Sequence, residues 1–231
     1  MSKVKKVLLP LLLAAALFCA GCGDNQPEDN NVIEPGTADA EIQADPGIND
    51  KGEATTLEDI AAAQSRISSY YFEQSLPSGD VNIFARVWYC DNKMKVVTSI
   101  NGELQSESYY DYNSRTQIDY SPADSDTAIA MDFDPNAADA PDNPLDDDYL
   151  TCTLLGNEVI DRQNCVIVQT ANGDKLWVST ADGFPMQVNF TDHFGAESTV
   201  AYRNIELNTV TASDVEVPAD LEIEYLNAGQ K

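Results

Sequence analysis

The side chains most often used in catalysis are either rare in this chain or too common to single out. The only histidine is His193, in the turn-like segment Thr191-Asp192-His193-Phe194-Gly195, and no nucleophile motif accompanies it. A zinc site that used His193 would need closely spaced ligands such as a CxxC pair, which the sequence lacks. The 39 Asp and Glu residues allow any carboxylate pair to be nominated and so favour none. We therefore expect no enzymatic activity, no cofactor and no structural metal.

The acidic segment 134–148 is the place where carboxylate spacing could bind a cation. Asp132, Asp134 and Asn136 resemble the opening of a calcium-binding EF-hand loop. An EF-hand is excluded, because Ala137 stands where the loop needs glycine and Asn143 where it needs a bidentate glutamate. A solvated acidic loop is the favoured interpretation, and a loose calcium site is the alternative. The carboxylates of such a site would be Asp139, Asp142, Asp146, Asp147 and Asp148.

Cysteine chemistry of a different kind is indicated at the amino end. Three lysines precede the apolar run Val7–Ala20, which as a helix of about 14 residues would reach about 21 Å, short of a membrane core of about 30 Å. This is typical of a secretory signal peptide, residues 1–21. The sequence Cys19-Ala20-Gly21-Cys22 resembles a bacterial lipobox, although Cys19 stands where leucine is usual. The resemblance implies that Cys22 is lipidated and anchors an exported protein to a membrane of the cell envelope; an ordinary cleaved signal is the alternative.

Residues 22–54 predict a disordered acidic tether. The segment is rich in Asp, Glu and Pro, carries the single base Lys51, and has few large apolar side chains with which to offset chain entropy. The whole chain has 13 Lys and Arg against 39 Asp and Glu; without Lys3, Lys5 and Lys6 of the signal, 10 remain against 39, a formal charge of −29. Nucleic acid is therefore excluded as a partner. Residues 55–231 have the length of one domain.

Cys90, Cys152 and Cys165 would remain in an oxidising compartment. A hairpin that turns near Arg162 would place Cys165 opposite Val159. Cys152 would then lie about 20 Å away at about 3.4 Å per residue, too far for a disulfide bond. We assign no bridge among the three cysteines.

A helix is predicted at the start of the domain. Thr55-Thr56-Leu57-Glu58 matches a capping box, with Thr55 as N-cap and Glu58 as its partner, and the helix should continue to about Ser68. Its apolar face could dock on a sheet, since five residues fall near helical spacing. These residues are Leu57, Ile60, Ala61, Gln64 and Ile67.

Strand patterns fill most of the remaining chain. Between Tyr70 and Phe133, apolar and polar residues alternate in runs separated by turns such as Asp91-Asn92 and Asn101-Gly102, which predicts an antiparallel sheet with one apolar face. On the other face, Phe84 and Trp88 are interpreted as scattered exposed aromatics. Three short apolar runs within 155–190 predict a meander, and 197–207 predicts one more strand. The fold class is therefore mainly β with α (α+β).

This order of elements resembles the LolA/LolB/RseB-like superfamily, and within it the lipoproteins of the outer-membrane lipoprotein-sorting type. The motifs that carry the resemblance are Ser69-Tyr70-Tyr71-Phe72-Glu73-Gln74, Lys93-Met94-Lys95-Val96, 127–133, Leu155-Gly156-Asn157-Glu158-Val159, Cys165-Val166-Ile167-Val168, Lys175-Leu176-Trp177-Val178, Gly183-Phe184-Pro185-Met186 and Val217-Pro218-Ala219-Asp220. The resemblance implies a curved antiparallel half-barrel sheet covered by helices on its concave face, with acyl chains as the usual cargo. The tether departs from the soluble LolA carrier and resembles LolB.

A fold of this kind would place a set of apolar side chains around a lipid-binding cavity, under a first helix that can lift. Their collective burial would bind an acyl chain, at about 0.8 kcal/mol for each buried CH₂, whereas the alternative is a closed, dry core. The candidate residues are Ile60, Ile67, Val87, Met94, Val96, Ile100, Tyr110, Ile129, Met131, Leu176 and Val178.

The sequence therefore predicts a membrane-tethered, non-enzymatic lipoprotein that binds acyl chains, lipid or lipidated proteins, as in lipoprotein sorting or transfer. Its contact with the membrane would run through the lipidated Cys22. The alternative is an envelope interaction or stress-sensor module that resembles RseB and binds a membrane protein partner.

Overall fold

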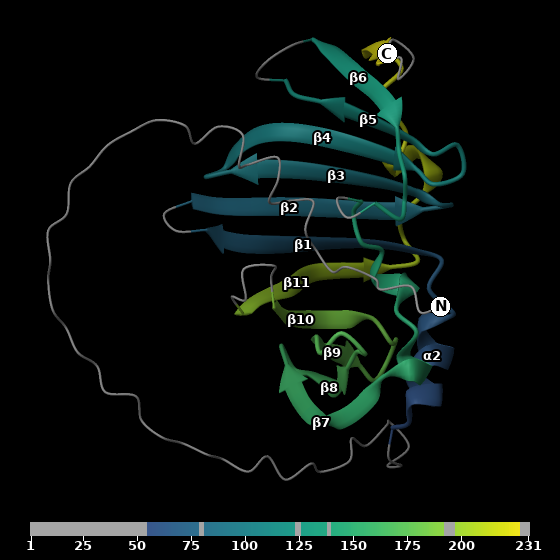
Figure 1. The fold of residues 1–231 in the computed structure, drawn as a ribbon, viewed down its shortest axis with the longest axis vertical. Coiled ribbons are helices and arrows are strands. Elements are labelled where there is room, and N and C mark those ends of the chain that lie inside the picture. The colour runs from purple at the N-terminus through teal and green to yellow at the C-terminus, as the bar shows by residue number, and fades with distance from the viewer. Residues whose placement is uncertain (1–54, 79–80, 123–125, 138–139, 192–196, 227–231) are drawn as a thin grey trace, which may run out of the picture.

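A single large curved sheet makes up most of the structure, which is a computed structural model (Figure 1). The structure describes residues 55–226 except 79–80, 123–125, 138–139 and 192–196. The predicted signal peptide, Cys22, the acidic tether and His193 therefore lie outside the described residues. The sheet has 12 strands in the order β12-β6-β5-β4-β3-β2-β1-β11-β10-β9-β8-β7. The strands are β1 (Ser69–Ser78), β2 (Val81–Cys90), β3 (Lys93–Ile100), β4 (Glu103–Asp111), β5 (Thr116–Tyr120), β6 (Thr127–Asp132), β7 (Thr153–Ile160), β8 (Gln163–Gln169), β9 (Lys175–Ser179), β10 (Pro185–Thr191), β11 (Glu197–Leu207) and β12 (Glu222–Tyr225).

The predicted strands and their turns are confirmed. Asp91 and Asn92 join β2 to β3 with φ of 52° and 60°, and Asn101 and Gly102 join β3 to β4 with φ of 51° and 88°. Two consecutive residues at positive φ give a tight hairpin whose twist matches the sheet, and Asn and Gly adopt this conformation most readily. Such turns fix the register, so the alternation of side chains along β2, β3 and β4 places one set of residues on each face.

The hairpin between β7 and β8 corrects one predicted register. It also turns on two residues at positive φ, Asp161 and Arg162, so that Ile160 pairs with Gln163. Cys165 therefore lies opposite Glu158 and not opposite Val159, because the turn consists of the two residues Asp161 and Arg162 and is not centred on Arg162 alone. Cys90, Cys152 and Cys165 are free.

One strand pairing differs from the expected antiparallel sheet. β12 pairs with β6 in parallel, whereas the other neighbouring strands pair antiparallel. To reach β6, residues 208–221 must pass the strands from β1 to β6, and they do so on the outer face. Val210 and Val215 of this segment pack with Cys90, against Tyr71 and Trp88.

The first helix, α2 (Leu57–Gln64), is shorter and starts one residue later than predicted. Thr56 is its N-cap: its side chain accepts a hydrogen bond from the Asp59 amide at 3.2 Å, and Asp59 accepts one from the Thr56 amide at 3.0 Å. Two overlapping threonine–acid pairs share the capping-box spacing, so the pattern alone could not choose between them. The helix ends at Gln64 with Ser65 as C-cap, and the chain then leads to β1.

The expected cover of helices over the sheet is not seen among the described residues. A helix of eight residues is about 12 Å long, too short to span a sheet whose strands lie about 4.8 Å apart. Residues 133–152, which we call the crossing segment, instead connect β6 to β7, near opposite edges of the sheet, and run across its inner side (Figure 1). Its described residues, 133–137 and 140–152, contain only two short 3₁₀ helices, η1 (Pro144–Asp146) and η2 (Tyr149–Thr151).

Helix α2 is locked against the turn between β9 and β10. Gly183 in this turn has φ of +74°, and a Cβ atom built on it would lie 2.5 Å from the Ile60 carbonyl oxygen and 2.6 Å from the Gln64 amide nitrogen. Only glycine permits so close an approach of two backbones. Ile60 is fully buried there, in a core that also contains Tyr70, Phe72 and Phe184. None of the described helices is long and apolar enough to cross a membrane.

Candidate functional site

The inner face of the sheet is the face that bears the buried core residues Tyr70, Phe72, Val87, Met94 and Val96. Most of the predicted cavity residues lie in this core. The buried ones are Ile60, Val87, Met94, Val96, Leu176 and Val178, and the partly buried ones that pack against them are Ile67 and Tyr110. The structure therefore brings together the predicted residues of both halves of the sheet, as a packed core.

Three predicted residues, Ile100, Ile129 and Met131, lie on the same face but are only half-buried. The strand register shows their relation to the core. Met94 pairs with Tyr110, Tyr110 with Gln117, and Gln117 with Met131, so this row runs continuously from β3 to β6. A neighbouring row leads from Val96 to Ile129 in the same way. The inner face thus continues beyond the packed core toward one edge of the sheet, with the polar residues Ser108, Gln117 and Asp119 between the core and the aliphatic pair Ile129 and Met131.

Tyrosine phenols hold the crossing segment over the core. The Tyr70 hydroxyl donates to Asn143 Oδ1 at 3.1 Å, and the Tyr112 hydroxyl donates to the Pro141 carbonyl at 3.3 Å. Gln64 of α2 adds a hydrogen bond from Nε2 to the Pro144 carbonyl at 3.3 Å. Burial raises the pKa of the Tyr70 and Tyr112 phenols, so both stay protonated and able to donate far above neutral pH.

A line of polar side chains lies on the inner face beside the aliphatic residues, and sequence analysis did not recognise it. The register places them in three neighbouring rows on β1, β3, β4 and β5, at positions where an inner face is usually apolar. We call these residues the polar strip: Gln74, Thr98, Ser106, Ser108, Gln117 and Asp119. A signal in the sequence could have found them. They are polar residues at every second position of a predicted strand, and the apolar residues that pair with them on neighbouring strands point inward.

Two acceptors of the polar strip lack a hydrogen-bond donor within the described part of the chain. Gln74 is 4% exposed, and its Oε1 atom has no hydrogen-bond partner. Asp119 accepts a hydrogen bond on Oδ2 from Gln117 Nε2 at 2.7 Å, while its buried Oδ1 has no partner. Burial raises the pKa of Asp119, and its polar neighbours Ser108 and Gln117 oppose this effect. Buried acceptors are almost always paired in folded proteins, so these two can accept donors from a bound molecule.

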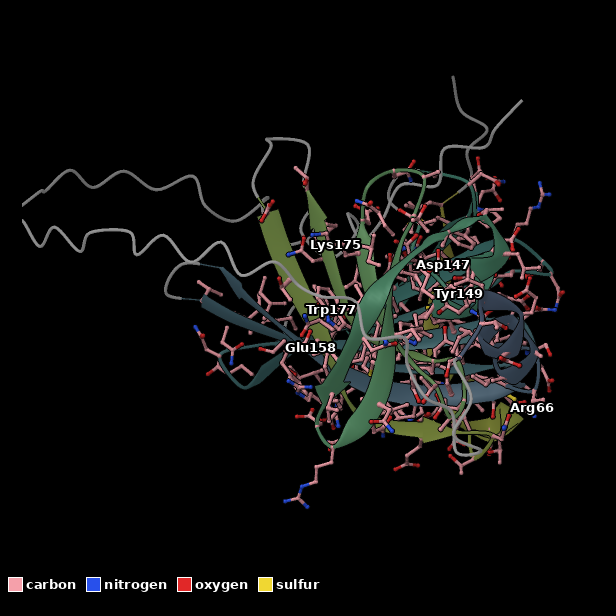
Figure 2. All side chains as sticks on the ribbon, turned by 90° about the horizontal axis from the view of Figure 1, so that it is seen from below. Arg66, Asp147, Tyr149, Glu158, Lys175 and Trp177 are labelled. Carbon is pink, nitrogen blue, oxygen red and sulfur yellow. The ribbon has the colours of Figure 1, made fainter. Side chains whose placement is uncertain are left out.

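The outer face offers less to a ligand, because its aromatic side chains already have polar neighbours. Lys95 Nζ lies 5.7 Å from the centre of the Trp88 ring and 5.2 Å from that of Tyr109, and pairs with Glu107 at 3.2 Å. Trp88 and Phe84, predicted to be exposed, are half-buried. In the other half of the sheet Trp177 Nε1 donates to Glu158 at 2.6 Å, and the two side chains lie together in Figure 2.

The acidic segment does not form a metal cluster among its described residues. Across the described chain, no group of three or more His, Cys, Asp or Glu side chains is arranged to hold a metal ion. Asp147 lies next to Tyr149 beside α2 (Figure 2). Asp139, one of the predicted calcium ligands, lies outside the described residues.

Comparisons with known proteins give no family assignment. No protein-family profile matches the chain, and no curated protein matches it. Among solved structures it is similar to MucB in the MucA/MucB complex of Pseudomonas aeruginosa, with 14% identity and a TM-score of 0.42, over 74% of this chain and 62% of that chain. A crystal structure of MucB matches with 14% identity and a TM-score of 0.34, over 72% and 62%, and a structure of PNGF-II with 7% and 0.37, over 70% and 32%. The chain thus spans less than two thirds of the length of each.

Proposed function

We propose that this protein is a membrane-tethered, non-enzymatic binding protein of the cell envelope that holds an acyl chain, a lipid or a lipidated partner on the inner face of its sheet. One observation carries the proposal. Ile129 and Met131 stay half-buried although they lie on the same face as the packed core and in the rows of Val96 and Met94. An aliphatic surface of this kind binds an alkyl chain at about 0.8 kcal/mol for each CH₂ removed from water.

The arrangement also indicates how a ligand reaches this surface. A lifting first helix was expected, but Ile60 is fully buried and the α2 backbone contacts the turn at Gly183. Tyr70 and Tyr112 hold the crossing segment in place over the core. Access of the alkyl chain is therefore expected at the half-buried end of the inner face, on β3 to β6.

Native mass spectrometry of the protein extracted gently from cells tests the proposal, with a fluorescent acyl probe as a second measurement. Ile129→Asn should weaken probe binding because it places an amide on the aliphatic surface. Ile118→Asn is the matched control, since Ile118 is also half-buried but lies on the outer face of the adjacent strand. A protein that is always empty and binds no probe would exclude this function.

The second candidate function is an envelope interaction module, and the edge strand β7 favours it. β7 ends the sheet and exposes Leu154 and Val159, at 39% and 62%. An unpaired edge with apolar side chains can accept a strand from a partner protein. Val159→Lys should then abolish capture of one membrane protein and leave probe binding unchanged, whereas loss of probe binding with capture intact would contradict it.

A further inference from the structure

The polar strip gives information about the ligand that the aliphatic surface alone does not. We propose that the ligand is an amphiphile whose polar end donates hydrogen bonds, as a hydroxyl, amide or ammonium group does, and that Asp119 and Gln74 accept them. A ligand that ends in a free carboxylate or phosphate does not fit. This inference rests on the proposed function and specifies the chemistry of its ligand.

The first argument is the lack of hydrogen-bond donors. Oδ1 of Asp119 and Oε1 of Gln74 are buried acceptors without a partner among the described residues. Leaving a buried acceptor unpaired destabilises a protein, whereas an apolar residue of the same shape would not. Both positions lie on a face where apolar residues predominate, so the two acceptors reduce stability unless a donor comes from beyond the described residues.

The second argument is position. Asp119 pairs in register with Ile129 on one side and with Ser108 on the other, so its carboxylate lies directly beside the half-buried aliphatic surface. An alkyl chain on Ile129 and Met131 would therefore bring its polar end to Asp119. Gln74 lies four strands from Asp119, about 19 Å along the sheet at about 4.8 Å per strand. A small head group reaches only one of the two acceptors, and a longer one with several donors follows the hydroxyls of Thr98 and Ser106 between them.

The third argument is charge. A carboxylate or phosphate would meet acceptors where it needs donors, and would meet the negative charge of Asp119. The formal charge of the whole sequence is −26, so the surrounding field also disfavours an anion. A neutral or cationic donor avoids both effects.

Four ligands with the same twelve-carbon chain test the inference: 1-monolaurin, dodecylammonium, dodecyltrimethylammonium and laurate. Each is titrated into the wild-type domain by calorimetry below its critical micelle concentration at neutral pH. We expect 1-monolaurin and dodecylammonium to bind about tenfold more tightly than laurate. Dodecyltrimethylammonium should bind about tenfold more weakly than dodecylammonium, because it keeps the charge but has no donor. This pair separates hydrogen bonding from nonspecific attraction of a cation.

Variants then assign the acceptors. Asp119→Leu should remove the preference for donors by about tenfold, while Asp132→Leu, at an exposed position on the outer face of β6, should not. Gln74→Leu should weaken only ligands long enough to reach β1, with the exposed Gln163→Leu as its control. Thermal unfolding shows whether each variant is folded, and the wild-type series decides the question without them.

The outcomes distinguish this inference from the proposed function. If none of the four ligands binds, the proposed function fails. If laurate binds as tightly as 1-monolaurin and dodecylammonium, or if Asp119→Leu keeps the preference for donors, the acyl-binding function stands and the inference about the head group is wrong.

Discussion

Replacement of Gly183 by alanine should destabilise the protein more than the same change in a turn where the new Cβ atom meets no other atom. The residue has φ of +74°, where an L-residue with a Cβ is strained by about 1–2 kcal/mol. The new methyl group would also lie 2.5 Å and 2.6 Å from two backbone atoms of α2, which cannot rotate away. Helix α2 must therefore shift and loosen the packing of Ile60, at about 1–3 kcal/mol, as in other overpacked cores. The expected loss is about 2–5 kcal/mol of the free energy of unfolding.

Gly173→Ala is the matched control for this substitution. Gly173 also lies in a turn between strands of the same half of the sheet, with φ of +94°, but a Cβ atom there would meet nothing within 4 Å. It should lose only the strain of about 1–2 kcal/mol. Both changes restrict the unfolded chain equally, so the difference between them isolates the contact with α2.

Urea denaturation followed by circular dichroism measures both variants against the wild type. The slope of the free energy of unfolding with urea should stay constant, while the midpoint falls further for Gly183→Ala. In thermal unfolding each kcal/mol corresponds to about 2–4 °C for a domain of this size. Equal destabilisation by the two substitutions would refute the reasoning that α2 is fixed against this turn and is part of the core.

Three further predictions concern the tyrosines and the thiols. Tyr70→Phe and Tyr112→Phe should each lower the free energy of unfolding by about 1 kcal/mol. Each should also speed hydrogen exchange of the amides in the crossing segment more than that of the amides in the sheet. Unchanged exchange in the crossing segment would count against an anchoring role. Burial raises the pKa of both phenols above the ordinary value of 10, so above that pH the folded state holds more protons than the unfolded state. The stability that the phenols contribute should be fully present from neutral pH to about pH 10 and fall as the pH rises beyond it. A urea stability that stays flat from pH 9 to pH 11.5 would contradict this. Burial raises the pKa of Cys152 and Cys165 to about 11, so both thiols should react slowly with iodoacetamide at pH 8. Cys165 should react more slowly than Cys152, because it is only 1% exposed. Reaction of either thiol at the rate of a free cysteine would refute this prediction.

Local patterns were enough to predict the strands and the face on which their residues lie. Val87, Met94 and Val96 alternate with polar residues, and turns such as Asn101-Gly102 impose one register, so each side chain could be assigned to a face from the sequence. The same reasoning found the core residues of β9, Leu176 and Val178. The family resemblance implied the inward positions Ile129 and Met131, but it does not show how much of a face is covered.

The parts that sequence analysis missed depend on contacts between distant residues. The crossing segment has no apolar period, and it is held in place by Tyr70 and Tyr112, which are distant from it in sequence. The parallel pairing of β12 with β6 likewise left no local signal. Asp119 was overlooked because its strand, Thr116–Tyr120, carries few apolar residues, so its inner face became evident only from the register with β4 and β6.

The pairing of β1 with β11 has a consequence for the order of folding. Tyr70 pairs with Leu207, whereas each of the two groups of strands that meet at this seam is built largely from hairpins between sequence neighbours. Closing a loop of this length loses much chain entropy before any contact forms, so the two groups of hairpins should form first and the seam last. If the chain crosses a membrane with its amino end first, one edge of β1 therefore stays unpaired until β11 has also crossed. In pulse-labelled refolding, the amides that β1 shares with β2 should become protected before those that it shares with β11.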